Sequence, residues 1–233
     1  MDKVKISLVI PCRNEGYHLR EVINSIPAII EEIIIVSNKS TDNTVEMGKC
    51  IAKENSKVVV IEDNRTLNGI GYGYAHITGI GMASGDFIIG SDGDAAYSFE
   101  EVNNVIEVME MQNIDFVSCN RYPVPKGVHI PLKLRFGVNL LNWEIRLFYG
   151  LKIKDILSGM WVFRQSVKNK LALTMGDWNL SPQIKLNALL NPEIRFMEYP
   201  IKQKIRLGKS KQNYFKTGFS HALWILKNRF KRK

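Results

Sequence analysis

Two carboxylates separated by one glycine are the residues in this chain best suited to chemistry. They are Asp92 and Asp94, and they follow the apolar run Phe87-Ile88-Ile89-Gly90. Alternate residues of an extended segment point the same way, so both carboxylates can face one divalent cation, while Gly93 lets the backbone approach a ligand. Carboxylate oxygens suit Mg²⁺ or Mn²⁺ bridging phosphates. The same tripeptide on its own is also typical of a solvated turn, so the flanking sequence has to decide.

The elements expected around this tripeptide place it at the edge of a sheet. The apolar run predicts a strand buried on both faces, and α/β proteins bind ligands just beyond the carboxyl ends of such strands. Apolar segments alternate with helical patterns, so we expect an α/β fold with a mostly parallel sheet covered by helices on both faces. Further strands are expected at 4–10, 32–36, 58–61, 116–119, 160–163 and 194–199. Helices are expected near 19–26, 44–53, 100–111, 132–149 and 181–190, and the glycine-dense segment 69–81 receives no element.

Composition and cysteine spacing bound the class of protein. The 233 residues are 45% hydrophobic and 24% charged, which is typical of a globular protein and excludes disordered and fibrous classes. Cys12, Cys50 and Cys119 form no CxxC pair, so neither a disulfide framework nor a structural zinc site is indicated. We expect a cytoplasmic protein without a signal peptide or an apolar run long enough to span a bilayer.

The positive charge of the chain is concentrated at its C-terminal end. The whole chain carries +9 and residues 195–233 carry +11, so the remaining residues carry −2. Aromatic residues are interleaved with these basic ones, which favours contact with an anionic membrane surface, although a solvated helix face is the alternative. The apolar helix expected at 132–149 is equally compatible with a core, a dimer contact or a membrane contact. No recognised nucleic-acid motif is present, so we expect no nucleic-acid partner.

Six short segments stand in order along the chain, at 9–15, 40–44, 69–81, 84–86, 92–94 and 158–164. Together they resemble glycosyltransferase family 2, most closely its dolichol-phosphate mannosyltransferase and polyprenyl-phosphate glycosyltransferase branch, and the resemblance extends from residue 4 to about residue 213. It implies a GT-A fold, a Rossmann-like sheet with helices on both faces, that binds a nucleotide-sugar with Mg²⁺ or Mn²⁺ and transfers the sugar with inversion. We expect this domain over 1–208 and a basic amphipathic helical tail, in contact with the membrane surface, over 209–233.

The resemblance also implies roles for individual residues. Metal ligands are Asp92 and Asp94, and catalytic residues are Asp94, Arg121 and Arg164. The nucleotide-sugar is bound by Pro11, Asn14, Glu15, Ser37, Asn38, Gly71, Asp92 and Gly93. The acceptor and its phosphate are bound by Ser158, Arg206, Lys209, Ser210 and Lys211. From the residues alone, each of the basic side chains could equally be a solvated surface charge, and Glu15 could cap a helix.

The chain departs from the family pattern at several of its motif positions. Ser37 and Asn38 stand where two aspartates are common, although both can still hydrogen-bond a nucleotide as neutral groups. Other departures are Tyr72 for a lysine, Ala96 for a glutamine, Trp161 for an arginine and Gln183 for an acid. These changes bear on the identity of the sugar and the nucleotide more than on the fold.

The acceptor is predicted from the proton that the reaction has to remove. A sugar hydroxyl requires a general base, whereas a lipid phosphate is already an anion and requires only positioning. The second half of the chain lacks the ED and QxxRW motifs of family members with hydroxyl acceptors. We therefore predict transfer of mannose or glucose from a GDP- or UDP-sugar to polyprenyl (dolichyl) phosphate at the cytoplasmic face of the membrane, where a partner subunit could anchor the protein. The alternatives are a glycan hydroxyl acceptor, or a non-catalytic relative that binds nucleotide or membrane.

Overall fold

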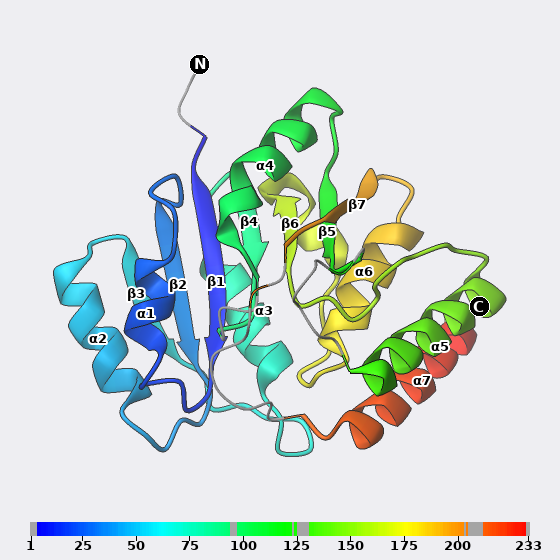
Figure 1. Cartoon of the computed structure of the whole chain (residues 1–233), viewed down its shortest axis with the longest axis horizontal. Coiled ribbons are helices and arrows are strands. Elements are labelled where there is room, and N and C mark those ends of the chain that lie inside the picture. The colour runs from blue at the N-terminus through cyan, green and yellow to red at the C-terminus, as the bar shows by residue number, and fades with distance from the viewer. Residues whose placement is uncertain are drawn as a thin grey trace.

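A seven-stranded sheet forms the centre of the molecule (Figure 1). The computed structural model describes residues 4–93, 97–122, 124, 131–202, 204 and 212–231. The strands are β1 Ile6–Cys12, β2 Glu32–Ser37, β3 Val58–Glu62, β4 Phe87–Gly90, β5 Phe116–Asn120, β6 Trp161–Arg164 and β7 Phe196–Pro200. Their order across the sheet is β3-β2-β1-β4-β6-β5-β7, and β6 runs antiparallel to both of its neighbours while the other pairs are parallel. The expected α/β fold with a mostly parallel sheet is confirmed.

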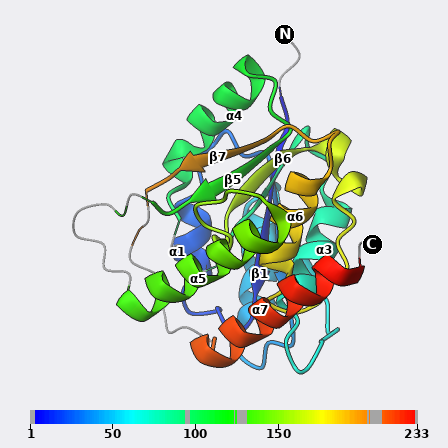
Figure 2. The same cartoon turned by 90° about the vertical axis from the view of Figure 1, so that its right-hand side faces the viewer.

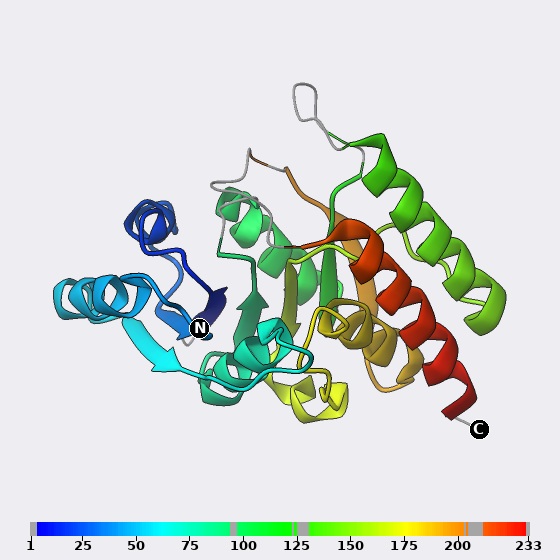
Figure 3. The ribbon, with the colours of Figure 1, turned by 90° about the horizontal axis from the view of Figure 1, so that it is seen from below.

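Helices cover both faces of this sheet, because its central strands carry apolar side chains on both sides. The helices are α1 Leu19–Asn24, α2 Thr44–Glu54, α3 Tyr72–Met82, α4 Val102–Met111, α5 Leu132–Tyr149, α6 Leu180–Leu190 and α7 Tyr214–Lys231. Helices α1, α2 and α4 pack on one face and α3 and α6 on the other, each face with its own apolar cluster (Figure 3). Strands β1 and β4 contribute to both clusters and are completely buried or nearly so over most of their length.

Helix α3 occupies the glycine-dense segment to which the sequence analysis assigned no element. A side chain at Gly79 would place its Cβ 2.3 Å from Val9 Cγ1, and one at Gly73 would place it 2.0 Å from the Met175 carbonyl oxygen. The glycines therefore let the helix approach the sheet and the 175–177 loop closely. Their lack of side chains also removes the apolar periodicity by which a helix is predicted from sequence.

Helices α5 and α7 lie side by side on the outer side of α6 (Figure 2). They share an apolar cluster with α6 in which Ile145 and Ile225 are completely buried. Burying one such side chain contributes roughly 1.5–3 kcal/mol. Hydrogen bonds also join the helices, from the Tyr149 hydroxyl to the Ile225 carbonyl (2.7 Å), from Arg229 Nε to the Phe148 carbonyl (2.7 Å) and from Asn228 Nδ2 to the Tyr149 hydroxyl (3.3 Å). The basic C-terminal segment thus packs onto the body of the molecule as a helix.

His76 is a polar side chain buried without compensation. It lies on α3 among aromatic rings, with centroid separations of 4.7 Å to Tyr72 and 4.9 Å to Trp161. Neither of its ring nitrogens has a hydrogen-bond partner among the described residues. Burial lowers the pKa of His76 to about 3, so the folded protein holds this imidazole neutral at pH values where a solvated histidine is charged.

Replacing His76 should therefore reduce the loss of unfolding free energy as the pH falls below 7. In the unfolded chain this histidine is protonated near pH 6.5, whereas its pKa in the folded protein is about 3. Its contribution to the free energy of unfolding is therefore fully present above pH 6.5 and is lost as the pH falls toward 3. In urea unfolding, the wild type should lose about 2 kcal/mol more than His76→Phe between pH 7 and pH 5. Tyr149→Phe, which removes no group that titrates in this range, should match the wild type. Equal losses in wild type and His76→Phe would contradict the assignment.

Candidate active site at the carboxyl edge of the sheet

The carboxyl ends of β1, β2, β3, β4 and β5 meet at one edge of the sheet, and polar residues follow each of them. This is the edge at which open α/β sheets bind ligands. Because β6 is antiparallel, its first residue rather than its last lies there, with Trp161 paired to Gly90. The segment that leads into β6 therefore joins the same edge.

Asp92 lies at this edge and is held from two sides. The Tyr72 hydroxyl donates a hydrogen bond to Asp92 Oδ1 (3.0 Å). The other carboxylate oxygen of Asp92, Oδ2, faces Gly159, where a Cβ atom would lie only 2.3 Å away from it. Burial, reinforced by the charge of Asp92, raises the pKa of the Tyr72 phenol well above its ordinary value, so this hydroxyl keeps its proton. Asp94, the second expected metal ligand, lies outside the described residues.

The described part of this edge is compatible with a divalent cation that is bound by protein and by the phosphates of a ligand together. Within the described ranges no three histidine, cysteine or acidic side chains cluster to form a protein-only metal cage. Mg²⁺ needs no such cage, since it is usually bound through one or two carboxylates, with phosphates and water completing the shell. The hard carboxylate oxygens of Asp92 are ligands of the kind that such an ion prefers.

The loops after β1 and β2 carry the residues expected to bind the nucleotide, and they are hydrogen-bonded to each other. The Asn14 amide donates to Ser40 Oγ (3.1 Å), and Asn14 Oδ1 accepts from the Thr41 amide (2.7 Å). Ser37 Oγ donates to Ser40 Oγ (2.9 Å). Asn14 has a positive φ of 54°, a conformation that asparagine tolerates better than most residues. The structure thus brings Asn14, Ser37 and Asn38 to the same edge as Asp92, together with Pro11, Glu15 and Gly93.

Asn38 joins the β2 loop to the segment after β3. Its Nδ2 donates to the carbonyl oxygens of Asp63 and Arg65, the latter at 2.9 Å. Gly71 lies directly against it, because a Cβ there would be 2.1 Å from Asn38 Oδ1. Sequence reasoning missed Asp63, whose carboxylate is bound by Arg65 at 2.6 Å. Chiefly through the Arg65 hydrogen bonds, the pKa of Asp63 is lowered to about 2. Its position directly after the apolar run of β3 is the signal that could have identified it.

A buried ion pair lies just beyond the carboxyl end of β5. Arg121 binds Asp155 in bidentate fashion, with Nε to Oδ2 at 2.6 Å and Nη2 to Oδ1 at 2.7 Å. Asp155 is completely buried. Burial acts to raise the pKa of Asp155, but the positive charge and hydrogen bonds of Arg121 outweigh it and hold the pKa below its ordinary value. The guanidinium of Arg121, which the family resemblance implies is catalytic, is thus already paired with a carboxylate of the protein.

Two further charged residues hold the segment around Asp155. Lys185 is completely buried on α6 and donates through Nζ to the carbonyl oxygens of Ile156 (2.8 Å) and Ser158 (2.5 Å). Burial lowers the pKa of Lys185 to about 7. From β7, Glu198 accepts hydrogen bonds from the amides of Lys154 (2.9 Å) and Asp155 (3.2 Å). The expected acceptor residue Ser158 donates to the Cys119 carbonyl oxygen.

Arg164, expected to be catalytic, does not join this site. It pairs with Phe87 at the beginning of β4, whereas Asp92 follows the end of that strand. The guanidinium donates to the carbonyl oxygens of Ile114 (3.0 Å) and Met109 (3.2 Å) and lies over the Phe87 ring. The family resemblance assigns Arg164 to the same motif as Ser158, but strand β6 carries Arg164 to the opposite edge of the sheet. Its contacts are those of a structural residue.

The remaining expected residues divide between undescribed and structural positions. Arg206, Lys209, Ser210 and Lys211 lie outside the described residues. Gln183 stands where the family resemblance expects an acid, and its Oε1 accepts hydrogen bonds from the amides of Thr174 (2.9 Å) and Met175 (2.9 Å). This amide therefore stabilises the loop that packs against the beginning of α3.

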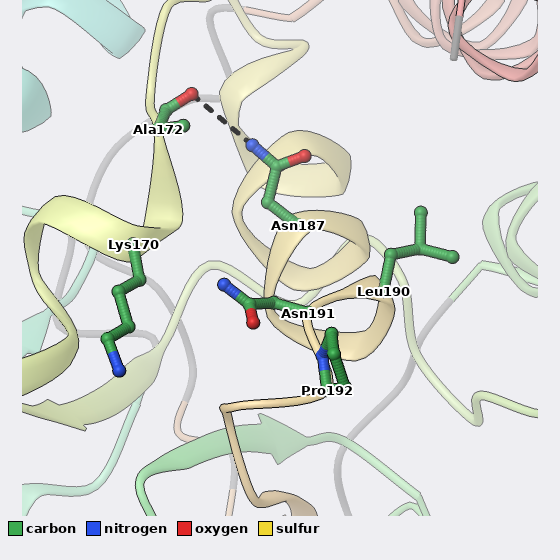
Figure 4. Close-up of a pocket in the computed structure, with 6 residues that line it drawn as sticks. All are labelled: Lys170, Ala172, Asn187, Leu190, Asn191 and Pro192. Carbon is green, nitrogen blue, oxygen red and sulfur yellow. Dashed lines mark hydrogen bonds between the residues drawn. The ribbon is translucent and has the colours of Figure 1, made fainter. Parts of the chain in front are cut away.

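A separate pocket lies at the end of α6 and in the preceding turns (Figure 4). Asn187 donates across it to the Ala172 carbonyl oxygen (3.3 Å). Its lining residues are Lys170, Ala172, Asn187, Leu190, Asn191 and Pro192. None of the expected site residues lines this pocket, so it is distinct from the edge that carries Asp92.

The fold and the edge site define the GT-A class of nucleotide-sugar-binding domains. The family model described as Glycosyl transferase family 2 matches residues 7–171, and the chain belongs to this family. The low-salt glycan biosynthesis hexosyltransferase Agl6 of Haloferax volcanii is 27% identical over 230 residues, which cover 96% of this chain and 53% of Agl6. The uncharacterized glycosyltransferase Rv0539 of Mycobacterium tuberculosis is 28% identical over 151 residues, 65% of this chain and 64% of that protein. The chain therefore spans only about half to two thirds of these curated relatives.

Solved structures agree on the fold. Glucosyl-3-phosphoglycerate synthase of Mycobacterium tuberculosis, in complex with Mn²⁺, UDP-glucose and phosphoglyceric acid, superposes with a TM-score of 0.71 at 18% identity, covering 97% of this chain and 79% of that one. The complex of the same enzyme with Mn²⁺, UDP and phosphoglyceric acid also gives 0.71, at 16% identity. At this level of identity, the likeness shows the GT-A-like fold alone.

Breaking the buried ion pair should destabilise the fold more than removing it entirely. Asp155→Leu leaves Arg121 largely buried without its counter-charge, which should cost about 3–5 kcal/mol in urea unfolding. Arg121→Met combined with Asp155→Leu should recover most of that loss, so the two substitutions are strongly non-additive. Glu54→Gln, which breaks the exposed pair with Arg20, is the control and should change little. Additive losses at 121 and 155 would show that the pair does not act as a unit.

Proposed function

We propose that the chain is a metal-dependent, inverting glycosyltransferase that moves mannose or glucose from a GDP- or UDP-sugar to polyprenyl (dolichyl) phosphate. The proposed binding of the sugar donor rests on the position of Asp92. This residue is held between Tyr72 and Gly159 at the carboxyl edge of a GT-A-like sheet. Family membership and the hexosyltransferase name of Agl6 support sugar transfer.

In this proposal, Asp92 and Asp94 bind Mg²⁺ or Mn²⁺ together with the diphosphate of the donor. The cation stabilises the negative charge that develops on the leaving nucleoside diphosphate. Mn²⁺ is supported by glucosyl-3-phosphoglycerate synthase, whose solved structure holds Mn²⁺ with UDP-glucose. The nucleotide lies against the interlinked loops after β1 and β2, where its ligands are Pro11, Asn14, Glu15, Ser37, Asn38, Gly71 and Gly93.

The side chain at position 183 supports an acceptor that brings its own negative charge. An amide cannot take a proton from a hydroxyl, and the Gln183 amide is fully engaged with Thr174 and Met175. A lipid phosphate needs no base, only positioning and charge compensation. In this role we place the basic residues Arg206, Lys209 and Lys211, with Ser210 between them, whereas the buried Ser158 hydroxyl is bonded to the Cys119 carbonyl oxygen.

An apolar face on α5 and α7 supports a lipid environment for that acceptor. Large apolar side chains are exposed at intervals of three or four residues on α5, and so along one stripe of the helix. These residues are Leu132, Phe136, Leu140, Trp143 and Leu147. The adjacent helix α7 exposes Tyr214, Phe215, Phe219, Leu223 and Phe230. Soluble proteins rarely expose so many large apolar residues on two neighbouring helices without a partner.

The charges on the same two helices favour anionic lipid. Both helices carry exposed basic residues, namely Lys133, Arg135, Arg146, Lys216, Lys227 and Lys231. The acid on these helices is Glu144, and burial raises its pKa to about 7, so that its negative charge is weakened. Each basic residue near an anionic surface adds about 1 kcal/mol. In the described ranges no helix is both long enough and apolar enough to cross a bilayer. We therefore propose peripheral binding at the cytoplasmic face, where a membrane-anchoring partner subunit could contribute.

Transfer to a lipid phosphate is tested with labelled GDP-mannose and UDP-glucose, Mn²⁺, and vesicles that contain polyprenyl phosphate. We expect a labelled, mild-acid-sensitive lipid product, and Asp94→Ala should lower its rate at least about 100-fold because a metal ligand is lost. Met111→Ala, at an exposed site on α4, is the control and should keep full activity. The proposal fails if no donor gives lipid product, if sugar hydroxyls are the better acceptors, or if Asp94→Ala turns over at the wild-type rate.

Membrane binding is tested by flotation with vesicles of phosphatidylcholine and phosphatidylglycerol. Trp143→Glu with Phe219→Glu should abolish flotation, because two large apolar side chains are replaced by charges that anionic lipid repels. Met111→Glu places the same charge on an exposed apolar position away from α5 and α7, and it should leave flotation unchanged. Raising the salt concentration should weaken wild-type binding. Wild-type protein that stays with the solution, or that forms a dimer broken by the same two substitutions, would assign the face to a different partner.

A further inference from the structure

Tyr72 makes a contact with Asp92 that the family resemblance does not supply. It is the first residue of α3, and it replaces the lysine of the family pattern with a neutral hydrogen-bond donor. Its hydroxyl lies 3.0 Å from Asp92 Oδ1. A lysine at this position would bring a positive charge beside the carboxylate, whereas a phenol orients the carboxylate and leaves its full negative charge for a cation.

The ring of Tyr72 is fixed in place by its neighbours. It packs on Trp178 with a centroid separation of 4.5 Å and an interplanar angle of 34°, and it meets the His76 ring edge-on at 4.7 Å. The loop that carries Trp178 is itself held, because the amides of Gly73 and Tyr74 donate to the Gly176 carbonyl oxygen at 3.0 and 3.2 Å. The hydroxyl consequently has little freedom to leave Asp92.

The opposite side of Asp92 is closed by a second rigid element. Gly159 lies against Oδ2, and its amide donates to Tyr97 Oη at 2.6 Å. Tyr97 is buried, and the preceding residue Ser158 is bound through its carbonyl oxygen by Lys185. The carboxylate therefore lies between a fixed donor and a fixed backbone, and this arrangement selects one orientation for it.

We propose that Tyr72 is a positioning residue that orients Asp92 for the cation and the donor diphosphate, with Trp178 as its support. The proposal rests on the proposed function, since it assigns Asp92 to the donor complex. Groups that orient a metal ligand typically contribute 10- to 100-fold to metal affinity. Tyr72→Phe removes only the hydroxyl and keeps the ring on Trp178, so it removes the contact with Asp92 without displacing the ring.

The test measures binding directly and does not require turnover. Mn²⁺ affinity is measured by electron paramagnetic resonance in the presence of UDP or GDP, with the thermal midpoint recorded for each variant. Tyr72→Phe should weaken Mn²⁺ binding about tenfold or more while the protein stays folded. Tyr149→Phe removes the hydroxyl of a tyrosine that bonds the Ile225 carbonyl far from the site, and it should bind Mn²⁺ like the wild type.

A double-mutant cycle with Asp92→Asn separates positioning from a general structural effect. If Tyr72 acts through Asp92, Tyr72→Phe should have little further effect on Mn²⁺ affinity in the Asp92→Asn background. Equal weakening in both backgrounds, or wild-type affinity in Tyr72→Phe, would overturn the positioning role and leave the proposed function standing. Absence of Mn²⁺ binding with either nucleotide in the wild type would overturn both.

Discussion

The completely buried carboxylate of Asp155 is the charge on which the geometry of the site depends. An isolated carboxylate in such an environment is strongly unfavourable, so the surrounding chain has to supply positive charge and hydrogen bonds. Arg121 supplies them from the end of β5, and Lys185 on α6 secures the next residues through their carbonyl oxygens. These contacts fix the segment that enters β6. The same segment ends in Ser158 and Gly159, and it therefore fixes the position of the backbone that contacts Asp92.

The antiparallel direction of β6 converts this fixed segment into part of the ligand edge. A parallel strand at this place would direct its last residues to the edge and bring Arg164 there. Because β6 runs the other way, Gly159 lies against Asp92, and Arg164 lies beside the beginning of β4 with backbone carbonyls as its partners. Proximity in sequence to a motif therefore does not determine which edge of a sheet a residue occupies.

The sequence predicts the strands well, because buried strands of a parallel sheet are continuous apolar runs that end at polar loops. All seven expected strands exist, and the edge position of Asp92 follows from the run before it. Helix α3 could not be predicted, since glycines that allow close packing carry no periodic signal. The charges of Asp155 and Lys185 were equally hidden. A single charged residue in a sequence is indistinguishable from a solvated one until the fold brings together partners that are about 30 residues apart.

The proposed membrane face and the edge of the sheet that carries Asp92 are joined through the loop before α6. On α7, Ser220 and His221 hydrogen-bond the Asn179 side chain at 3.1 and 2.8 Å. The residue before Asn179 is Trp178, which packs on Tyr72, and Tyr72 in turn binds Asp92. Helix α7 therefore braces the support of the Asp92 carboxylate as well as presenting apolar side chains outward. Under the proposed function, a shift of α7 would therefore affect the membrane face and the support of Asp92 together.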